Sequence, residues 1–211
     1  MKPPPLRPGA TIGIAAISSP PDPDRLEAGI DSLRARGYRI REATNLRAVH
    51  GFLAGTDEER AAGYRSLLRD PDVAAIFFAR GGYGAGRILH LLDPREAGEH
   101  PKVHLGGSDL TALFAYLWRH SGLVAFYGPM VAVEMAGGEE LDWEPVLRGA
   151  IPAGERFPEG SILAPGRAEG PLLGGCLSLL ASLAGTPHAL AADDAILFWE
   201  DVGEEPYRLD R

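Results

Sequence analysis

A serine that stands between a strand-like run and a helix-like run has the position in this sequence that best suits covalent chemistry. The apolar run at 103–105 is followed by two glycines, then by Ser108 and Asp109, and then by apolar residues at helical spacing. Two glycines permit a sharp turn, and the free amide groups and dipole at a helix N-terminus favour a developing negative charge. The stretch therefore has the layout of a nucleophile elbow, although it reads Gly-Gly-Ser-Asp-Leu and not G-x-S-x-G.

The same serine also suits a purely structural role. Serine is one of the preferred helix N-cap residues, and Ser108 stands where the cap of the following helix belongs. This stretch taken alone favours the cap over the nucleophile, so the remaining turns of the chain have to decide between the two.

A glycine-rich turn at 80–86 is the candidate source of an oxyanion donor. It follows the apolar run at 73–79 and reads Arg-Gly-Gly-Tyr-Gly-Ala-Gly, so its backbone can approach a substrate closely. Beside Ser108, this loop would supply one backbone N–H to an oxyanion and Asp109 would supply the other. Two alternatives stay open: a tight turn without a ligand, and a nucleotide-binding turn at 82–86. The latter has the spacing G-x-G-x-G and not the G-x-G-x-x-G of a dinucleotide site.

An acid near the end of the sequence is the candidate third member of a catalytic set. A serine nucleophile needs a base, and the base needs a group that orients it. Glu200 follows the apolar run at 195–199 and suits that role, whereas its alternative is a solvated acid in a cluster with Asp201. None of the six histidines stands in an obvious loop after a strand, and no pair has zinc-site spacing. We therefore expect no metal.

Apolar runs alternate with helical patterns through the first 150 residues. This alternation predicts an α/β fold, in which a Rossmann-like parallel sheet carries helices on both faces. The predicted strands are 11–17, 38–43, 73–79, 103–105 and 123–127. The predicted helices are 24–36, 56–69 with a capping box at its start, 87–92, the helix after Ser108 to about 121, and 142–149.

Ligands of such sheets bind beyond the carboxyl ends of the strands. Loops that follow predicted strands bring five residues to that edge. We expect them to contact the substrate: Ser18, Arg80, Gly81, Tyr83 and Tyr127.

Residues 151–170 form the predicted boundary between two domains. Prolines and glycines punctuate them and no periodic pattern continues through them, which is typical of a linker. Residues 1–150 make up the α/β domain with the elbow. Residues 171–211 offer about one helix, one strand and the start of another helix, which is too little apolar surface for an independent core. We therefore expect them to be the first part of an incomplete, β-rich second domain.

The net charge, the cysteine count and the length of the apolar runs limit which partners and which cell compartment suit this protein. The net charge of -8 argues against nucleic acid or an anionic membrane surface as the main partner. Cys176 is the one cysteine, which excludes an internal disulfide and suits a reducing cytoplasm. No apolar run approaches membrane-spanning length, and the proline-rich start does not read as a signal peptide.

Six segments together resemble the family of murein L,D-carboxypeptidases and microcin C self-immunity peptidases. They occur in the order that the family has, and they extend over nearly the whole sequence. The segments are 14–20 (IAAISSP), 79–86 (ARGGYGAG), 106–112 (GGSDLTA), 127–129 (YGP), 171–187 (PLLGGCLSLLASLAGTP) and 198–211 (FWEDVGEEPYRLDR).

The resemblance implies a serine peptidase with a Ser…Glu…His triad, in which Ser108 matches the nucleophile and Glu200 the acid. It implies backbone oxyanion donors at Gly82 and Asp109. The implied reaction removes the terminal D-alanine of a peptidoglycan tetrapeptide, a small muropeptide, during wall recycling in the cytoplasm. The resemblance implies no metal or organic cofactor, a smaller β-rich C-terminal domain, and a homodimer.

One departure from the family affects the expected activity. The family's catalytic histidine lies in its C-terminal domain, beyond position 211, and no histidine of this sequence matches it. If these residues are the whole protein, the triad lacks its base and turnover should be very poor. Two alternatives therefore stay open: a degenerate homologue that binds peptide without turnover, and a nucleotide-binding α/β protein.

Overall fold

A five-stranded parallel sheet forms the centre of the computed structural model, which describes residues 1–138, 142–150 and 160–210. The strand order is β2-β1-β3-β4-β5, and all four neighbouring pairs are parallel. This confirms the predicted fold class. The strands are β1 (Thr11–Ala15), β2 (Arg39–Glu42), β3 (Val73–Phe78), β4 (Val103–Gly106) and β5 (Phe126–Tyr127).

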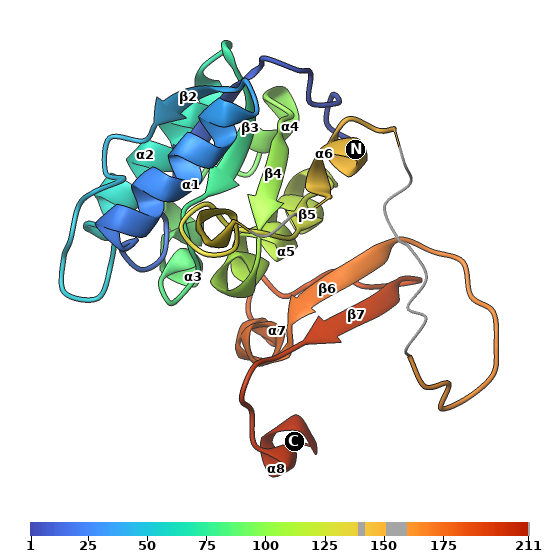
Figure 1. Ribbon diagram of the computed structural model, residues 1–211. Helices are drawn as coiled ribbons and strands as arrows, with labels where there is room; N and C mark the ends of the chain where they lie inside the picture. The colour runs from blue at the N-terminus through green and yellow to red at the C-terminus, as the bar shows by residue number, and fades with distance from the viewer. Residues whose placement is uncertain (139–141, 151–159, 211) are drawn as a thin grey trace.

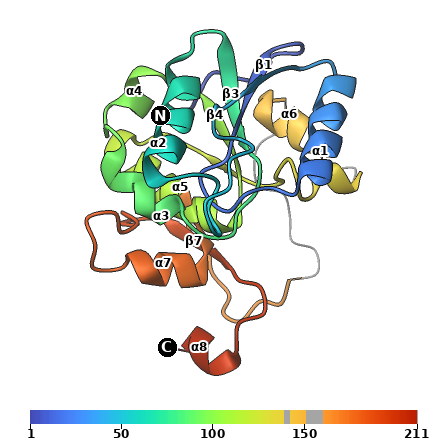
Figure 2. The ribbon, with the colours of Figure 1, turned by 90° about the vertical axis from the view of Figure 1, so that its left-hand side faces the viewer.

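Helices cover both faces of this sheet, and each face has its own apolar core (Figures 1 and 2). One face packs against α1 (Pro23–Ala35), the 3-10 helix η3 (Met135–Gly137) and α6 (Trp143–Leu147). The other face packs against α2 (Asp57–Arg69), α3 (Ala85–Ile88), the 3-10 helix η1 (Leu89–Leu91), α4 (Glu96–Glu99) and α5 (Thr111–Ser121). Alternate residues of β1 and β3 point to opposite cores, which is why these two strands read as continuous apolar runs, whereas the edge strand β2 reads Arg-Ile-Arg-Glu.

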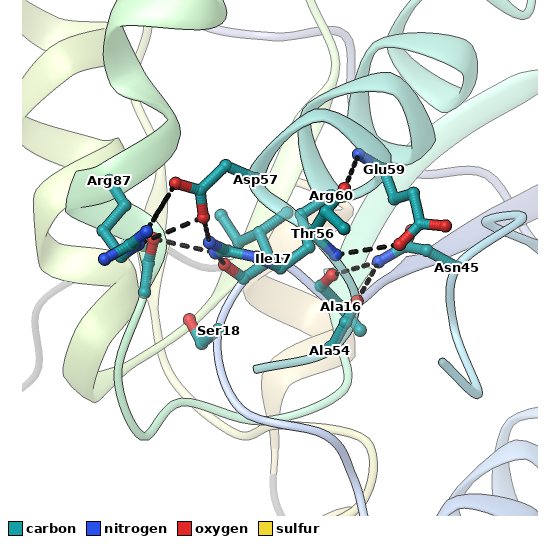
Figure 3. A network of polar contacts seen from close by, with 12 residues as sticks. Ala16, Ile17, Ser18, Asn45, Ala54, Thr56, Asp57, Glu59, Arg60 and Arg87 are labelled. Atoms are coloured by element: carbon teal, nitrogen blue, oxygen red, sulfur yellow. Dashed lines mark hydrogen bonds and ion pairs between the residues drawn. The ribbon is translucent and has the colours of Figure 1, made fainter. Parts of the chain in front are cut away.

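A buried arginine on α2 supports the loops at the carboxyl ends of β1 and β3. Thr56 and Glu59 form the predicted capping box that starts this helix. One turn further on, fully buried Arg60 donates to the carbonyl oxygens of Ile17 and, at 2.8 Å, of Gly84. Figure 3 shows Arg60 between Ile17 and Asp57, with Arg87 on the far side of Asp57. The helix start thereby fixes two loops that border the predicted ligand edge.

Arg60→Met is expected to lower the free energy of unfolding by roughly 3–5 kcal/mol, because it leaves buried polar partners without a donor. Arg87→Met is the matched control, since Arg87 binds the same carboxylate with 46% of its side chain exposed, against 0% for Arg60. Loss of that exposed pair should cost less than about 1 kcal/mol. Urea unfolding of both variants measures the difference, and equal losses would contradict the supporting role of Arg60.

A histidine of β4 and a tyrosine of α2 form a hydrogen-bonded pair inside the core. His104 Nδ1 donates to the Lys102 carbonyl oxygen at 3.0 Å, and Nε2 accepts from the Tyr64 hydroxyl at 2.9 Å. Burial lowers the pKa of His104 to about 4. His104 is therefore neutral in the folded protein at neutral pH.

The wild type is expected to lose stability as the pH falls from about 6.5 to about 4, by up to about 3 kcal/mol from this one group. The unfolded state binds a proton at His104 near pH 6.5, and the folded state does so only near pH 4, so acid favours unfolding over that range. His104→Gln keeps a donor and an acceptor but does not titrate. Urea unfolding at several pH values should show a flatter pH dependence for this variant, and an unchanged slope would refute the assignment.

A second, smaller unit lies beyond the carboxyl end of the main sheet (Figure 1). It consists of β6 (Leu172–Cys176), α7 (Leu177–Leu183), β7 (Ile196–Glu200) and the short α8 (Pro206–Asp210). The two strands pair in parallel, with Gly175 opposite Trp199 and Cys176 opposite Glu200. Of the predicted linker, 151–159 lies outside the described residues, and 160–170 is exposed and forms no helix or strand.

The strand β6, which contains two adjacent glycines, was not among the predicted strands. The structure explains both glycines by close approach: a Cβ on Gly174 would lie 1.7 Å from the Phe198 carbonyl oxygen, and one on Gly175 would lie 2.5 Å from Thr111 Oγ1.

Across the described residues, no helix has the length and apolar character needed to cross a bilayer.

Candidate active site

Ser108 adopts a strained backbone conformation at the turn between β4 and α5. Its φ angle is +55°, and among the described residues Asp194 is the other non-glycine residue with a positive φ. The left-handed region costs an L-residue about 1–2 kcal/mol, and such strain persists only where the surroundings hold it in place. The 3-10 helix η2 (Ser108–Leu110) begins at this residue and leads into α5. The turn therefore has the sharpness that an elbow requires.

The N-cap alternative for Ser108 does not describe this turn. The N-cap positions of η2 and α5 are Gly107 and Leu110, and no side chain caps either helix. The backbone of Ser108 is hydrogen-bonded on both sides, while its hydroxyl has no protein partner in the described part of the chain. A hydroxyl that is half-buried, caps no helix and stands on a strained turn favours the nucleophile interpretation over the structural one.

A pocket of about 640 Å³ opens in front of Ser108. Its wall comes from the ends of β4 and β5 and from the second unit, where β6 and β7 end. Ser108 and Glu200 both line it, so the structure brings the two candidate catalytic side chains to one cavity. Further residues of the wall carry a hydroxyl, a thiol or a carboxylate: Tyr127, Glu134, Cys176, Asp201 and Glu204.

The glycine-rich turn after β3 lies directly against the elbow. A Cβ placed on Gly81 would be 2.9 Å from Ser108 Cβ, 3.1 Å from Ser108 Oγ and 3.3 Å from the Asp109 backbone nitrogen. Gly82 has a φ of +105°, and a Cβ there would lie 2.4 Å from Ser19 Oγ. Glycine is therefore required at both positions, and Gly81 brings its backbone to within contact of the Ser108 hydroxyl.

Asp109 has a buried carboxylate that joins three loops. Its Oδ2 accepts from Ser18 Oγ at 2.6 Å and from the Ala85 N–H at 2.8 Å. Burial raises the pKa of this carboxyl, while the bonds from Ser18 and Ala85 act in the opposite direction. Because this carboxylate occupies the N-terminus of α3, the geometry does not favour the alternative in which the turn at 82–86 binds a phosphate.

Four of the five expected substrate contacts are absent from the pocket lining: Gly81, which lies against the elbow, and three residues whose side chains are placed elsewhere. Ser18 is fully buried, because its hydroxyl donates to Asp109 instead of facing the pocket. Arg80 is half-buried and its guanidinium points to the Pro20 carbonyl oxygen, 3.5 Å away. Tyr83 is 54% exposed, with its ring 5.8 Å from that of Phe52. None of the three lines the pocket.

Tyr127 lines the pocket, but its hydroxyl is used within the protein. It accepts from the Ser108 N–H at 2.7 Å and donates to the Glu200 carboxylate. Burial is the larger cause and the neighbouring Glu200 the second cause of a raised pKa at the Tyr127 phenol. The phenol therefore stays protonated and donates a hydrogen bond to Glu200. Ser108 and Glu200 are thus connected through Tyr127.

The histidines of the chain lie elsewhere. His104 is in the core with Tyr64, and His120 and His188 lie beside each other and beside Tyr116. No histidine is among the residues that line the pocket within the part of the chain that the structure describes.

Sequence reasoning missed Thr111, which the structure places between the elbow and β6. Thr111 Oγ1 donates to the Ser108 carbonyl oxygen at 2.7 Å and accepts from the Cys176 N–H at 3.0 Å. The first of these contacts has a signal in the sequence, because a hydroxyl in the first turn of a helix commonly bonds a carbonyl three residues earlier. The contact to Cys176 depends on tertiary structure and has no such signal.

Comparison with known protein families gives two adjacent matches in this chain. The LD-carboxypeptidase N-terminal domain matches residues 12–128, and the LD-carboxypeptidase C-terminal domain matches residues 169–211.

Individual relatives agree with these matches. A protein of Bacillus subtilis named "Probable murein peptide carboxypeptidase" is 38% identical over all of this chain and 68% of its own length. The murein tetrapeptide carboxypeptidase of Pseudomonas aeruginosa is 33% identical over 95% of this chain and 69% of its own. The crystal structure of a muramoyltetrapeptide carboxypeptidase from Oxalobacter formigenes superposes with a TM-score of 0.80 at 32% identity, over 95% of this chain and 69% of its own.

Proposed function

The chain belongs to the LD-carboxypeptidase family, and from this premise we propose that it is a serine-type carboxypeptidase that releases the terminal D-alanine of murein tetrapeptides. The free Ser108 hydroxyl on its strained turn, facing a pocket that also contains Glu200, is the observation that carries the proposal. Release of D-alanine from such fragments would place the protein in peptidoglycan recycling in the cytoplasm, and the active form would be a homodimer.

The proposed reaction follows acyl transfer through Ser108. Its oxygen attacks the carbonyl carbon before D-alanine, and the N–H groups of Gly82 and Asp109 stabilise the oxyanion. The serine proton passes to a base and then to the nitrogen of D-alanine, which leaves as the C–N bond breaks. Water then hydrolyses the acyl-enzyme and regenerates Ser108. Glu200 would orient the base through the carboxylate oxygen that Tyr127 does not use.

The charge of the pocket supports a peptide with an amine over a phosphorylated ligand. Four carboxylate residues line it, and its lining residues in the described part of the chain include no lysine or arginine. A wall of one sign attracts ligands of the opposite sign. The residue before D-alanine in a murein tetrapeptide carries a free amine, which suits this wall.

The first experiment compares two muropeptides that differ in the stereochemistry of the terminal bond. In the tetrapeptide this bond joins an L-centre to D-alanine, and in the pentapeptide it joins two D-alanines. We expect the protein to release D-alanine from the tetrapeptide and not from the pentapeptide, as chromatography or a coupled D-amino-acid oxidase assay would measure. Equal release from both would refute an L,D-specific carboxypeptidase.

A second candidate function is binding of the same peptide without turnover. The observation that favours it is the pocket lining, which includes no histidine within the described residues. Calorimetry with the tetrapeptide would then show a binding isotherm and chromatography would show no product. Saturable binding with product release would exclude this candidate.

A further inference from the structure

Ser108 is held on both sides of its backbone by hydroxyl groups, and each of these also bonds to the second unit. The Ser108 N–H donates to the Tyr127 hydroxyl at 2.7 Å, and that hydroxyl donates to Glu200 at the end of β7. The Ser108 carbonyl oxygen accepts from Thr111 Oγ1 at 2.7 Å, and Thr111 Oγ1 accepts from the N–H of Cys176 at the end of β6, at 3.0 Å. The elbow is therefore bridged twice to paired strands that belong to the other family domain.

Both bridges lie in tightly packed surroundings. Thr111 is fully buried, and the approach of β6 to it requires glycine, since a Cβ on Gly175 would lie 2.5 Å from Thr111 Oγ1. The Tyr127 ring packs edge-on against Phe198 of β7, with the ring centroids 5.8 Å apart. Both hydroxyls therefore lie against strands of the second unit.

The strain at Ser108 gives these bridges their significance. A non-glycine residue keeps a left-handed conformation only while its neighbours enforce it, and small displacements of a reacting group can lower a rate by about 100-fold. We propose that Thr111 and Tyr127 are positioning residues, a two-hydroxyl clamp that keeps the elbow in its reactive conformation while β6 and β7 are docked against it. The catalytic side of this inference rests on the proposed function, whereas its structural side rests on the hydrogen bonds alone.

Thr111→Val tests the clamp because it removes the hydroxyl and keeps the shape. Thr186 provides a matched control, since its Oγ1 also donates to the carbonyl three residues earlier, that of Leu183 at 2.7 Å, and also accepts a backbone N–H, that of His188 at 3.2 Å. We expect Thr111→Val to lower kcat by about 10- to 100-fold with KM little changed. Thr111→Ser should restore kcat because it keeps the hydroxyl, and Thr186→Val should leave it unchanged.

Hydrogen exchange measured by mass spectrometry provides a readout that does not depend on turnover. Thr111→Val should speed amide exchange both in the elbow peptide, 105–112, and in the β6 peptide, 172–177, whereas Thr186→Val should change neither. Tyr127→Phe should act on the elbow in the same way, with Tyr116→Phe as its control, because Tyr116 donates to the Leu92 carbonyl oxygen at 3.1 Å away from the pocket. The double variant should lose less than the product of the single losses, since both hydroxyls hold one residue.

The outcomes separate the clamp from the proposed function. Faster exchange in the Thr111→Val elbow without any wild-type hydrolysis would support the clamp and refute the proposed function. Hydrolysis that depends on Ser108 but is unaffected by Thr111→Val, with unchanged exchange, would overturn the clamp and keep the function. If Thr111→Val does not fold, Tyr127→Phe decides by the same two measurements, and equal exchange in Tyr127→Phe and Tyr116→Phe would overturn the proposal.

Discussion

Where a base is available to Ser108, Ser108→Ala is expected to lower the rate of D-alanine release by about 10⁴-fold or more, with the protein still folded. The hydroxyl is the atom that would form the covalent bond, and water positioned in its place would have only the oxyanion donors and the pocket to assist it. Because Ser108 Oγ makes no hydrogen bond within the described part of the chain, its loss leaves no protein group unsatisfied. Alanine should therefore leave the thermal unfolding temperature nearly unchanged.

Ser182→Ala is the control for this experiment. Ser182 is exposed on α7 and does not line the pocket; its hydroxyl donates to the Leu179 carbonyl oxygen at 2.7 Å. Steady-state release of D-alanine from the tetrapeptide, measured for the wild type and both variants, gives the result. Release by Ser108→Ala equal to that of an active wild type would remove this serine from the mechanism.

Gly81→Ala is expected to lower the same rate by about 10²–10³-fold, the usual effect of losing one oxyanion donor. The added methyl group would lie 3.1 Å from Ser108 Oγ and 3.3 Å from the Asp109 backbone nitrogen, so it would enter the space that an oxyanion needs. The backbone of the loop would have to move away from the elbow to relieve these contacts.

Gly86→Ala gives a matched control within the same segment. A Cβ on Gly86 would meet only Ala112 Cβ, at 3.9 Å, and Gly86 lies within α3, where alanine is the better helix former. Its activity should equal that of the wild type. Circular dichroism would show that both variants fold, and a Gly81→Ala variant with full activity would place the oxyanion elsewhere.

The parallel sheet was predictable because its inner strands β1 and β3 are buried on both faces and read as continuous apolar runs. The capping box at Thr56 and the glycines before Ser108 were predictable for another reason: both depend only on residues next to one another in the sequence. The proximity of Ser108 and the Gly81 turn followed from the rule that strand ends in a parallel sheet share one edge, whereas Glu200 ends a strand of the separate two-stranded sheet. These features depend on short stretches of sequence.

The remaining parts of the site depend on contacts between distant segments. The Ser18 side chain points inward because its hydroxyl donates a hydrogen bond to Asp109, 91 positions later in the sequence. The Tyr127 hydroxyl bonds to the Ser108 N–H and to Glu200, although the residue lines the pocket. The strand β6 has glycines where other backbone and Thr111 approach it, and local patterns read such glycines as a turn. No periodicity within one segment contains this information.

The exposed face of β7, outside the pocket wall, carries an optical reporter. Trp199 is 58% exposed and directly precedes Glu200, whereas Trp143 is 7% exposed and packed in the core. Indole fluorescence shifts to shorter wavelengths when water is excluded from the ring. Any molecule that covers this face of β7 would therefore change the emission of Trp199, so contact with the side of the strand that faces away from the pocket can be titrated by fluorescence.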